Sequence, residues 1–158
     1  MGMEPIGVRR LNHAVLRVRD VPRALGFYRD VLGLEVIAGD SRTAAFLRAP
    51  GSENHHELGL FGLGDGAPGP EPGRVGLYHL AWEVATIRDL ARARDLLTEQ
   101  GALVGASDHG ATKSLYAVDP DGNELELMWL VPRAEWGEHE SSAPVGALDL
   151  EAELTRWG

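Results

Sequence analysis

The sequence predicts an α+β fold in which two βαβββ modules in one chain form a curved mixed sheet. Two observations lead to this prediction. A pattern of one strand, one helix and three further strands occurs twice, and a stretch rich in Gly and Pro separates the two copies. His13 and Gly33 in the first copy occupy the places of His79 and Gly101 in the second. A duplicated unit explains this match better than chance does.

The first module covers about residues 9–62. Its opening segment, 11–19, is rich in apolar and β-branched side chains, as strands are. Asp20 is typical of a helix N-cap and Gly33 of a helix end, and apolar residues recur between them at helical spacing. Three shorter strands are expected after the helix, at 34–38, 43–48 and 56–61.

A connector over about residues 62–76 holds too much Gly and Pro for a helix or a central strand. The second module follows over about 77–131, and its helix over 87–100 is capped by Thr86. Its four strands are expected at 77–84, 103–107, 113–118 and 124–130. The tail, 132–158, is polar and ends in a short predicted helix, with no function assigned to it. We expect one domain over residues 1–158.

Composition limits the partners. The chain has 158 residues, 24 acidic against 15 basic, so its formal net charge is −9 and a nucleic-acid partner is not expected. The absence of cysteine excludes thiolate ligands and a cysteine nucleophile. No apolar run has the length of a membrane span or of a signal-peptide core. A cytoplasmic location, away from membranes, is therefore expected.

Three side chains, His13, His79 and Glu126, are the best candidates for metal ligands. Side chains alternate along a strand, and each of these residues lies on the less apolar face of its strand. If the apolar faces pack under helices, the three ligands converge in a cleft on the other side of the sheet. Two His and one carboxylate leave open coordination positions and suit Fe(II), although Mn(II), Zn(II) or Ni(II) would also be accepted.

Four other residues are further candidates for the functional site. His56 begins a strand, His109 lies in a loop and Tyr116 lies in the next strand, and each of them alone is compatible with an ordinary structural role. Glu57 points to the opposite side from His56. Alternation then puts Glu57 in the cleft as a fourth ligand, unless a bulge or an early strand end reverses the two faces.

The order of these residues resembles the vicinal oxygen chelate superfamily, which includes glyoxalase I, bleomycin and fosfomycin resistance proteins, and extradiol dioxygenases. The resemblance covers about residues 9–131. The segments HELGL at 56–60 and DHGATKSLY at 108–116, followed by DPDGNELE at 119–126, are most similar to type I extradiol dioxygenases of the catechol 2,3-dioxygenase kind. Typical members have two such double-module domains, whereas this chain has one.

The resemblance implies a function and site roles. Fe(II), or in some members Mn(II), would be bound by His13, His79 and Glu126, with His56 as the acid–base residue. His109 would contact bound oxygen and Tyr116 the substrate. A catechol-like vicinal diol and O2 would be the small-molecule partners, and a homodimer is expected.

Two alternatives stay open at this point. A glyoxalase- or epimerase-like lyase or isomerase would use Glu57 as a fourth ligand and would need no O2. A small-molecule binding or resistance protein would use the same cleft without a metal, although such a protein has no use for the three ligands.

Overall fold

The computed structural model describes residues 4–158 and divides into two compact units, Met1–Ala67 and Pro68–Gly158. The boundary falls inside the connector that the sequence predicts over residues 62–76. The single domain expected over residues 1–158 stays a prediction. Within the described residues, no helix has the length and apolar character needed to cross a membrane.

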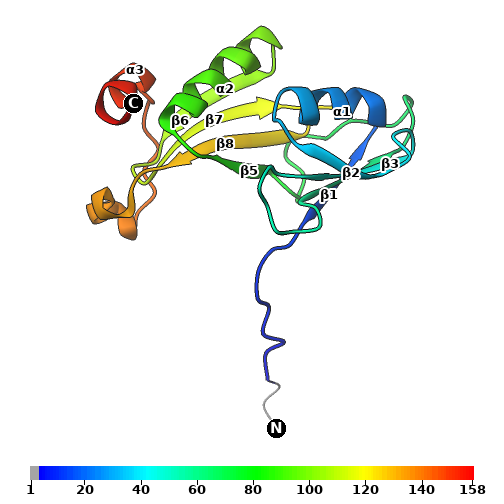
Figure 1. Ribbon diagram of the computed structural model, residues 1–158, viewed down its shortest axis with the longest axis horizontal. Coiled ribbons are helices and arrows are strands. Elements are labelled where there is room, and N and C mark those ends of the chain that lie inside the picture. Colours follow the sequence, from blue (N-terminus) through cyan, green and yellow to red (C-terminus); the bar gives the residue numbers. More distant parts are fainter. Residues whose placement is uncertain (1–3) are drawn as a thin grey trace. The chain divides into compact units, whose positions relative to one another are not determined.

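The first unit contains one βαβββ module (Figure 1). Its elements are β1 (Ala14–Val18), α1 (Val21–Asp30), β2 (Glu35–Gly39), β3 (Ala44–Arg48) and β4 (Leu58–Gly62). The sheet order is β1-β4-β3-β2. Strand β1 runs parallel to β4, and the other two pairs are antiparallel, so the sheet is mixed.

Helix α1 covers β3 and β4 on one side of this sheet. The Asp20 carboxylate accepts a hydrogen bond of 2.7 Å from the Arg23 N–H and so caps the helix, as the sequence predicts. The face turned to the sheet is apolar. The side chains buried between helix and sheet include Val21, Leu25, Tyr28, Leu47 and Leu60. Helix α1 does not cover the opposite face of this sheet.

The second unit repeats the pattern. Its module consists of β5 (His79–Val84), α2 (Ile87–Glu99), β6 (Leu103–Asp108), β7 (Thr112–Val118) and β8 (Glu124–Leu130). The sheet order is β5-β8-β7-β6, again with one parallel pair, between β5 and β8. Thr86 caps α2 by accepting from the Asp89 N–H. The two βαβββ modules of the predicted α+β fold are therefore confirmed, with one four-stranded sheet in each.

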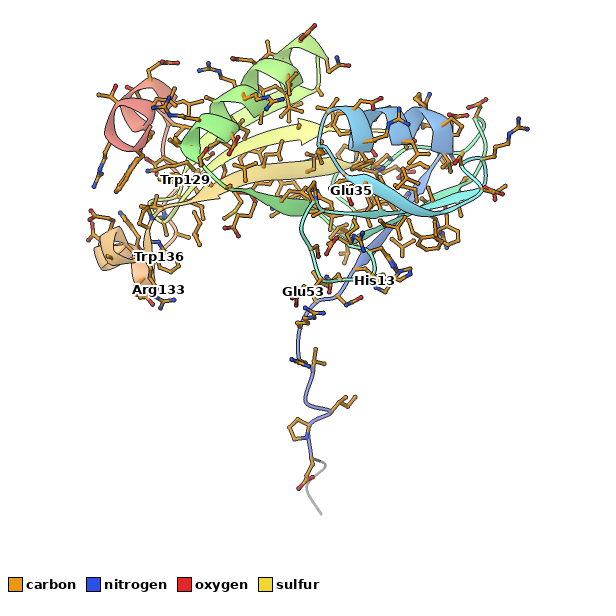
Figure 2. The ribbon with its side chains drawn as sticks, viewed as in Figure 1. His13, Glu35, Glu53, Trp129, Arg133 and Trp136 are labelled. Carbon is orange, nitrogen blue, oxygen red and sulfur yellow. The ribbon has the colours of Figure 1, made fainter. Side chains whose placement is uncertain are left out.

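The tail of the second unit forms two short 3-10 turns, Arg133–Glu135 and Gly137–Glu140, and the helix α3 (Leu150–Trp157). Figure 2 labels Arg133 and Trp136 in this region, where the guanidinium lies 5.0 Å from the centre of the indole ring. Helix α3 lies beside α2, and the Trp157 ring is 5.8 Å from that of Trp129 on β8. The predicted C-terminal helix is confirmed, and it packs on its own module.

One strand boundary differs from the prediction in a way that affects the site. Strand β4 begins at Leu58, whereas the sequence places its start at residue 56. The backbone of Glu57 still joins both neighbours, because its N–H donates to Leu47 and its carbonyl accepts from Ala14. His56 lies outside the ladder, so strict alternation does not fix the direction of its side chain.

Candidate metal and catalytic site

Strands β5 and β8 bring His79 and Glu126 together. In this parallel pair Ala81 is opposite Glu126, so His79 lies one diagonal away on the same face. The other face of β8 carries Leu125, Leu127 and Trp129, all buried under the helices. The alternation predicted for β8 is thus confirmed.

The His79 Nε2 and Glu126 Oε2 atoms lie 3.1 Å apart, with side-chain exposures of 26% and 12%. Two donors that each bind one ion at about 2.1 Å and at right angles are about 3 Å apart, so this spacing fits a shared metal. His79 Nδ1 is buried and has no hydrogen-bond partner within the described residues. Nε2 is therefore the nitrogen that has a polar neighbour and that is placed for coordination.

His13 lies in the first unit, immediately before β1, and its side chain is labelled in Figure 2. Its Nδ1 is 2.8 Å from the amide oxygen of Asn12, which can only accept, so Nδ1 carries the proton and Nε2 keeps its lone pair. The next strand positions follow the predicted alternation, since Val15 and Arg17 are exposed and Leu16 is buried.

His56 lies beside His13, with ring centroids 4.5 Å apart. Phe46 contacts the His56 ring edge-on at 5.0 Å, and the Nδ1 atoms of His55 and His56 are 2.9 Å apart. Burial, and then the nearby charges of His13 and His55, lower the pKa of His56 below its usual value. The structure thus brings the predicted acid–base residue to the predicted ligand of the same module.

The carboxylate of Glu57 is hydrogen-bonded to the loop between β3 and β4. Its carboxylate accepts a hydrogen bond of 2.8 Å from the Ala49 N–H and another from the Ser52 hydroxyl. Burial would raise the pKa of Glu57, but the hydrogen bonds from Ser52, Ala49 and Asn54 and the charge of Arg48 outweigh burial and lower it. Glu57 keeps the predicted alternation, since its backbone joins the ladder and Leu58 beside it is buried, but its carboxylate is engaged by this loop.

Strand register shows which residue of the first module corresponds to Glu126. Glu126 is opposite Ala81, two residues after His79, and in the first module Val15, two residues after His13, is opposite Gly59. The counterpart of Glu126 is therefore Gly59, and Glu57 falls one alternation step earlier. A Cβ on Gly59 would lie 3.3 Å from the Val15 side chain, on the exposed side of β1. The first module thus has no carboxylate at the matching position.

His109 and Tyr116 form a second contacting pair. The hydroxyl of Tyr116 is 2.8 Å from His109 Nε2, and the Tyr116 ring lies 5.8 Å from that of His79. Tyr116 is opposite Glu126 in the β7–β8 ladder. Burial, followed by the charge of Glu126, raises the pKa of Tyr116, while the Ser107 hydroxyl acts in the opposite direction. The second unit therefore brings four of the predicted site residues together, three from strands and His109 from a loop.

The sequence reasoning did not identify Ser114, which is fully buried on the same side of β7 as Tyr116. Its hydroxyl has no hydrogen-bond partner within the described residues. Side chains two residues apart in a strand share a face, and this was the signal in the sequence that could have identified Ser114. Counting outward from Tyr116 would have placed Ser114 on this face.

Neither unit contains, among the described residues, a group of three or more His, Asp or Glu side chains that could hold a metal ion. The predicted ligands are divided between the units: His13 belongs to the first, and His79 and Glu126 to the second. The convergence of all three on one ion stays a prediction, and the contacting pair of His79 and Glu126 fits it.

The chain is similar in sequence to several curated proteins. The chain is 39% identical over 120 residues to biphenyl-2,3-diol 1,2-dioxygenase 3 of Rhodococcus globerulus, covering 75% of this chain and 62% of that protein. It is 32% identical over 158 residues to catechol-2,3-dioxygenase of Bacillus subtilis (strain 168), covering 94% of this chain and 52% of that protein. The chain thus spans roughly half of the length of such curated relatives.

Solved structures show the same fold. A glyoxalase/dioxygenase from Nostoc punctiforme superposes with a TM-score of 0.67 at 23% identity, covering 84% of this chain and 98% of that one. A domain from Frankia sp. EAN1pec, described as glyoxylase/bleomycin resistance protein/dioxygenase, gives a TM-score of 0.63 at 25% identity, with coverage of 79% and 100%. A family model matches residues 10–127, and the chain accordingly belongs to the Glyoxalase/Bleomycin resistance protein/Dioxygenase superfamily.

Proposed function

We propose that this chain acts as a metal-dependent extradiol dioxygenase, which cleaves the ring of a catechol-like vicinal diol with O2. The observation that carries the proposal is the contact between His79 and Glu126 at 3.1 Å on the open face of the second sheet. The similarity to proteins named as diol dioxygenases supports the same reaction class. The lack of a carboxylate at Gly59 favours a set of two His and one Glu.

The proposed ligands are His13, His79 and Glu126, for Fe(II) in the first place and Mn(II) in the second. When bound there, such an ion supplies open positions for both diol oxygens and for O2, and it lowers the pKa of the diol hydroxyls. The carboxylate and two neutral imidazoles leave the site with a net positive charge, which attracts an anionic diol.

The remaining residues of the site handle protons and orientation. His56, in ring contact with His13, takes a proton from a diol hydroxyl and returns it later. The Tyr116 hydroxyl hydrogen-bonds a substrate oxygen. His109, bonded to that hydroxyl, holds its orientation and would contact O2.

Oxygen uptake tests the proposal. Protein loaded anaerobically with Fe(II) is mixed with a panel of catechols, including biphenyl-2,3-diol, and both oxygen consumption and the yellow ring-cleavage product are followed. We expect uptake for the wild type, its loss in Glu126→Gln, and its retention in Glu124→Gln, which changes an exposed carboxylate on the same face of β8.

The outcomes separate the candidate reactions. No uptake with any catechol, by protein shown to contain iron, contradicts the dioxygenase proposal. Turnover of a carbonyl substrate without O2 would instead indicate an isomerase. That chemistry requires a fourth ligand, yet Glu57 is engaged by Ala49 and Ser52.

A further inference from the structure

The C-terminal tail is joined to the loop that carries His109. Residues Asp108 and Gly146 form an antiparallel bridge, in which each N–H donates to the carbonyl of the other at 2.9 Å. His109 is the next residue after Asp108. The path of the tail at residues 144–146 is therefore fixed directly beside this histidine.

The tail also contacts the imidazole itself. His109 Nδ1 lies 2.7 Å from the carbonyl oxygen of Pro144, 35 residues later in the chain. A carbonyl oxygen can only accept, so Nδ1 must carry the proton. In the neutral ring Nε2 then has the lone pair, and the Tyr116 hydroxyl, at 2.8 Å, donates to it. One backbone carbonyl thus sets the hydrogen-bond direction of the whole pair.

A second part of the tail closes over the same loop. The imidazole of His139 lies so close to Gly110 that a Cβ there would be 2.3 Å from its Cγ. Gly110 has a φ of +76°, and its N–H donates to the Asp108 carboxylate at 2.7 Å. Only glycine combines this backbone conformation with the close approach of a ring. Glycine at position 110 therefore allows the tail to pack directly against this loop.

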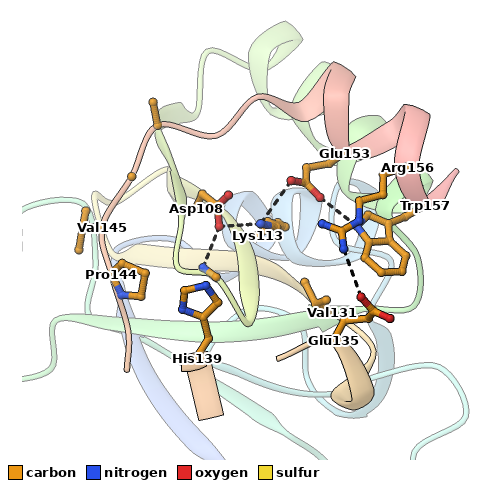
Figure 3. A pocket seen from close by; sticks show the side chains of 13 residues that line it. Asp108, Lys113, Val131, Glu135, His139, Pro144, Val145, Glu153, Arg156 and Trp157 are labelled. Carbon is orange, nitrogen blue, oxygen red and sulfur yellow. Dashed lines mark hydrogen bonds and ion pairs between the residues drawn. The ribbon is translucent and has the colours of Figure 1, made fainter. Parts of the chain in front are cut away.

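A buried lysine anchors the end of the tail, as Figure 3 shows. Lys113 on β7 is 6% exposed, and its Nζ lies 2.6 Å from Asp108 and 3.3 Å from Glu153 on α3. The Trp157 indole N–H donates to Glu153 at 3.0 Å. Burying an ammonium group is costly unless it is paired, so α3 stays where Glu153 meets Lys113. The surrounding pocket has a volume of about 380 Å³.

We propose that residues 132–158 are a positioning element for His109. Through the Pro144 carbonyl the tail holds the imidazole in its Nδ1–H form and directs Nε2 to the Tyr116 hydroxyl. The phenol donates its only proton to His109, so its oxygen presents lone pairs to a donor in the site. The role of that donor, a diol hydroxyl, rests on the proposed function, whereas the protonation pattern of His109 does not.

Nitrogen NMR measures this pattern in metal-free protein. Long-range 15N–1H spectra of protein labelled at its histidines distinguish the Nδ1–H from the Nε2–H form, and the His109 signals are assigned from their loss in His109→Gln. We expect the Nδ1–H form in the wild type at neutral pH, with a scalar coupling across the hydrogen bond to the Pro144 carbonyl carbon. An Nε2–H form in the wild type overturns the proposal without any further variant.

Position 146 offers a matched pair of variants. Gly146→Pro removes the N–H that donates to Asp108, whereas Gly146→Ala keeps it, and the added Cβ would lie in ordinary contact at 3.6 Å from the Asp108 oxygen. We expect Gly146→Ala to keep the Nδ1–H form and Gly146→Pro to lose it, together with the coupling to Pro144. Unchanged amide signals from β5 and β8, in the same unit as Gly146, show that the Pro variant remains folded.

The outcomes also separate this inference from the proposed function. If Gly146→Pro is folded but retains the Nδ1–H form, the tail does not set the state of His109 and the inference fails. If the wild type has the Nδ1–H form but consumes no O2 with any catechol, the proposed function fails and the positioning role stands.

Discussion

The Nε2 atom of His79 lies 3.1 Å from Oε2 of Glu126, across one diagonal of the parallel pair β5–β8. The two side chains reach this distance because both point away from the helices of their module. A histidine and a carboxylate in this relation form either an ion pair or two ligands of one ion. Metal content distinguishes the two cases.

The first prediction therefore concerns metal affinity. His79→Gln removes one proposed ligand, and we expect its Fe(II) or Mn(II) affinity to fall by at least about 100-fold, since even partners that only orient ligands contribute about 10–100-fold. Equilibrium dialysis followed by elemental analysis gives the value. His55→Gln, at an exposed histidine of the first unit, is the control and should bind as the wild type does. If both variants bind the metal equally well, His79 is not a ligand and forms only an ion pair with Glu126.

Glu57 gives a prediction of the opposite kind. Glu57→Gln weakens the hydrogen bonds from Ala49 and Ser52, so we expect unfolding free energy to drop by about 1–3 kcal/mol while metal content stays at the wild-type level. Chemical denaturation and metal analysis of the same sample provide both numbers. Glu53→Gln changes an exposed carboxylate in the same loop and should alter neither. Metal loss in Glu57→Gln but not in Glu53→Gln would contradict this prediction and support a four-ligand site that includes Glu57.

Gly110 allows a test of the contact between tail and loop. Gly110→Ala meets both a positive φ of +76° and the His139 ring, and we expect a loss of about 1–3 kcal/mol or more from backbone strain together with displacement of the tail. Thermal unfolding measures the first effect, and protease sensitivity of residues 132–158 the second. Gly76→Ala, where a Cβ would meet nothing within 4 Å, is the control. Wild-type protection of the tail in Gly110→Ala would contradict the close packing.

Asp108 gives a pH dependence. Burial would raise the pKa of its carboxyl, but hydrogen bonds from Lys113 and the Gly110 N–H outweigh burial and hold it below its ordinary value of 3.8. A lowered pKa means that the folded state favours the ionised form. The resulting stability is fully present above the ordinary value and is lost as the pH falls through the folded-state pKa.

Denaturation curves of the wild type and Asp108→Asn, recorded from about pH 7 down into the acid range, test this expectation. The wild type should be more stable by a constant margin at neutral pH, and the margin should shrink only below the ordinary carboxyl pKa. A margin that already shrinks between about pH 7 and pH 5 would mean that Asp108 does not carry a lowered pKa.

The sequence by itself determined the features that depend on neighbouring residues. Period-two alternation placed Glu126 opposite the buried Leu125 and Leu127, and the caps at Asp20 and Thr86 started both helices. The repeated order of elements gave the two modules. These predictions succeeded because alternation and capping involve residues within a few positions of each other.

Only the tertiary structure decided how the remaining site residues are used. The Ala49 N–H and the Ser52 hydroxyl bind the Glu57 carboxylate in the loop before β4, and the register of β1 against β4 makes Gly59 the counterpart of Glu126. The hydrogen bond from His109 to Pro144 joins residues 35 positions apart. Register and long-range contacts depend on where the chain returns in space, and local residue patterns do not encode that path.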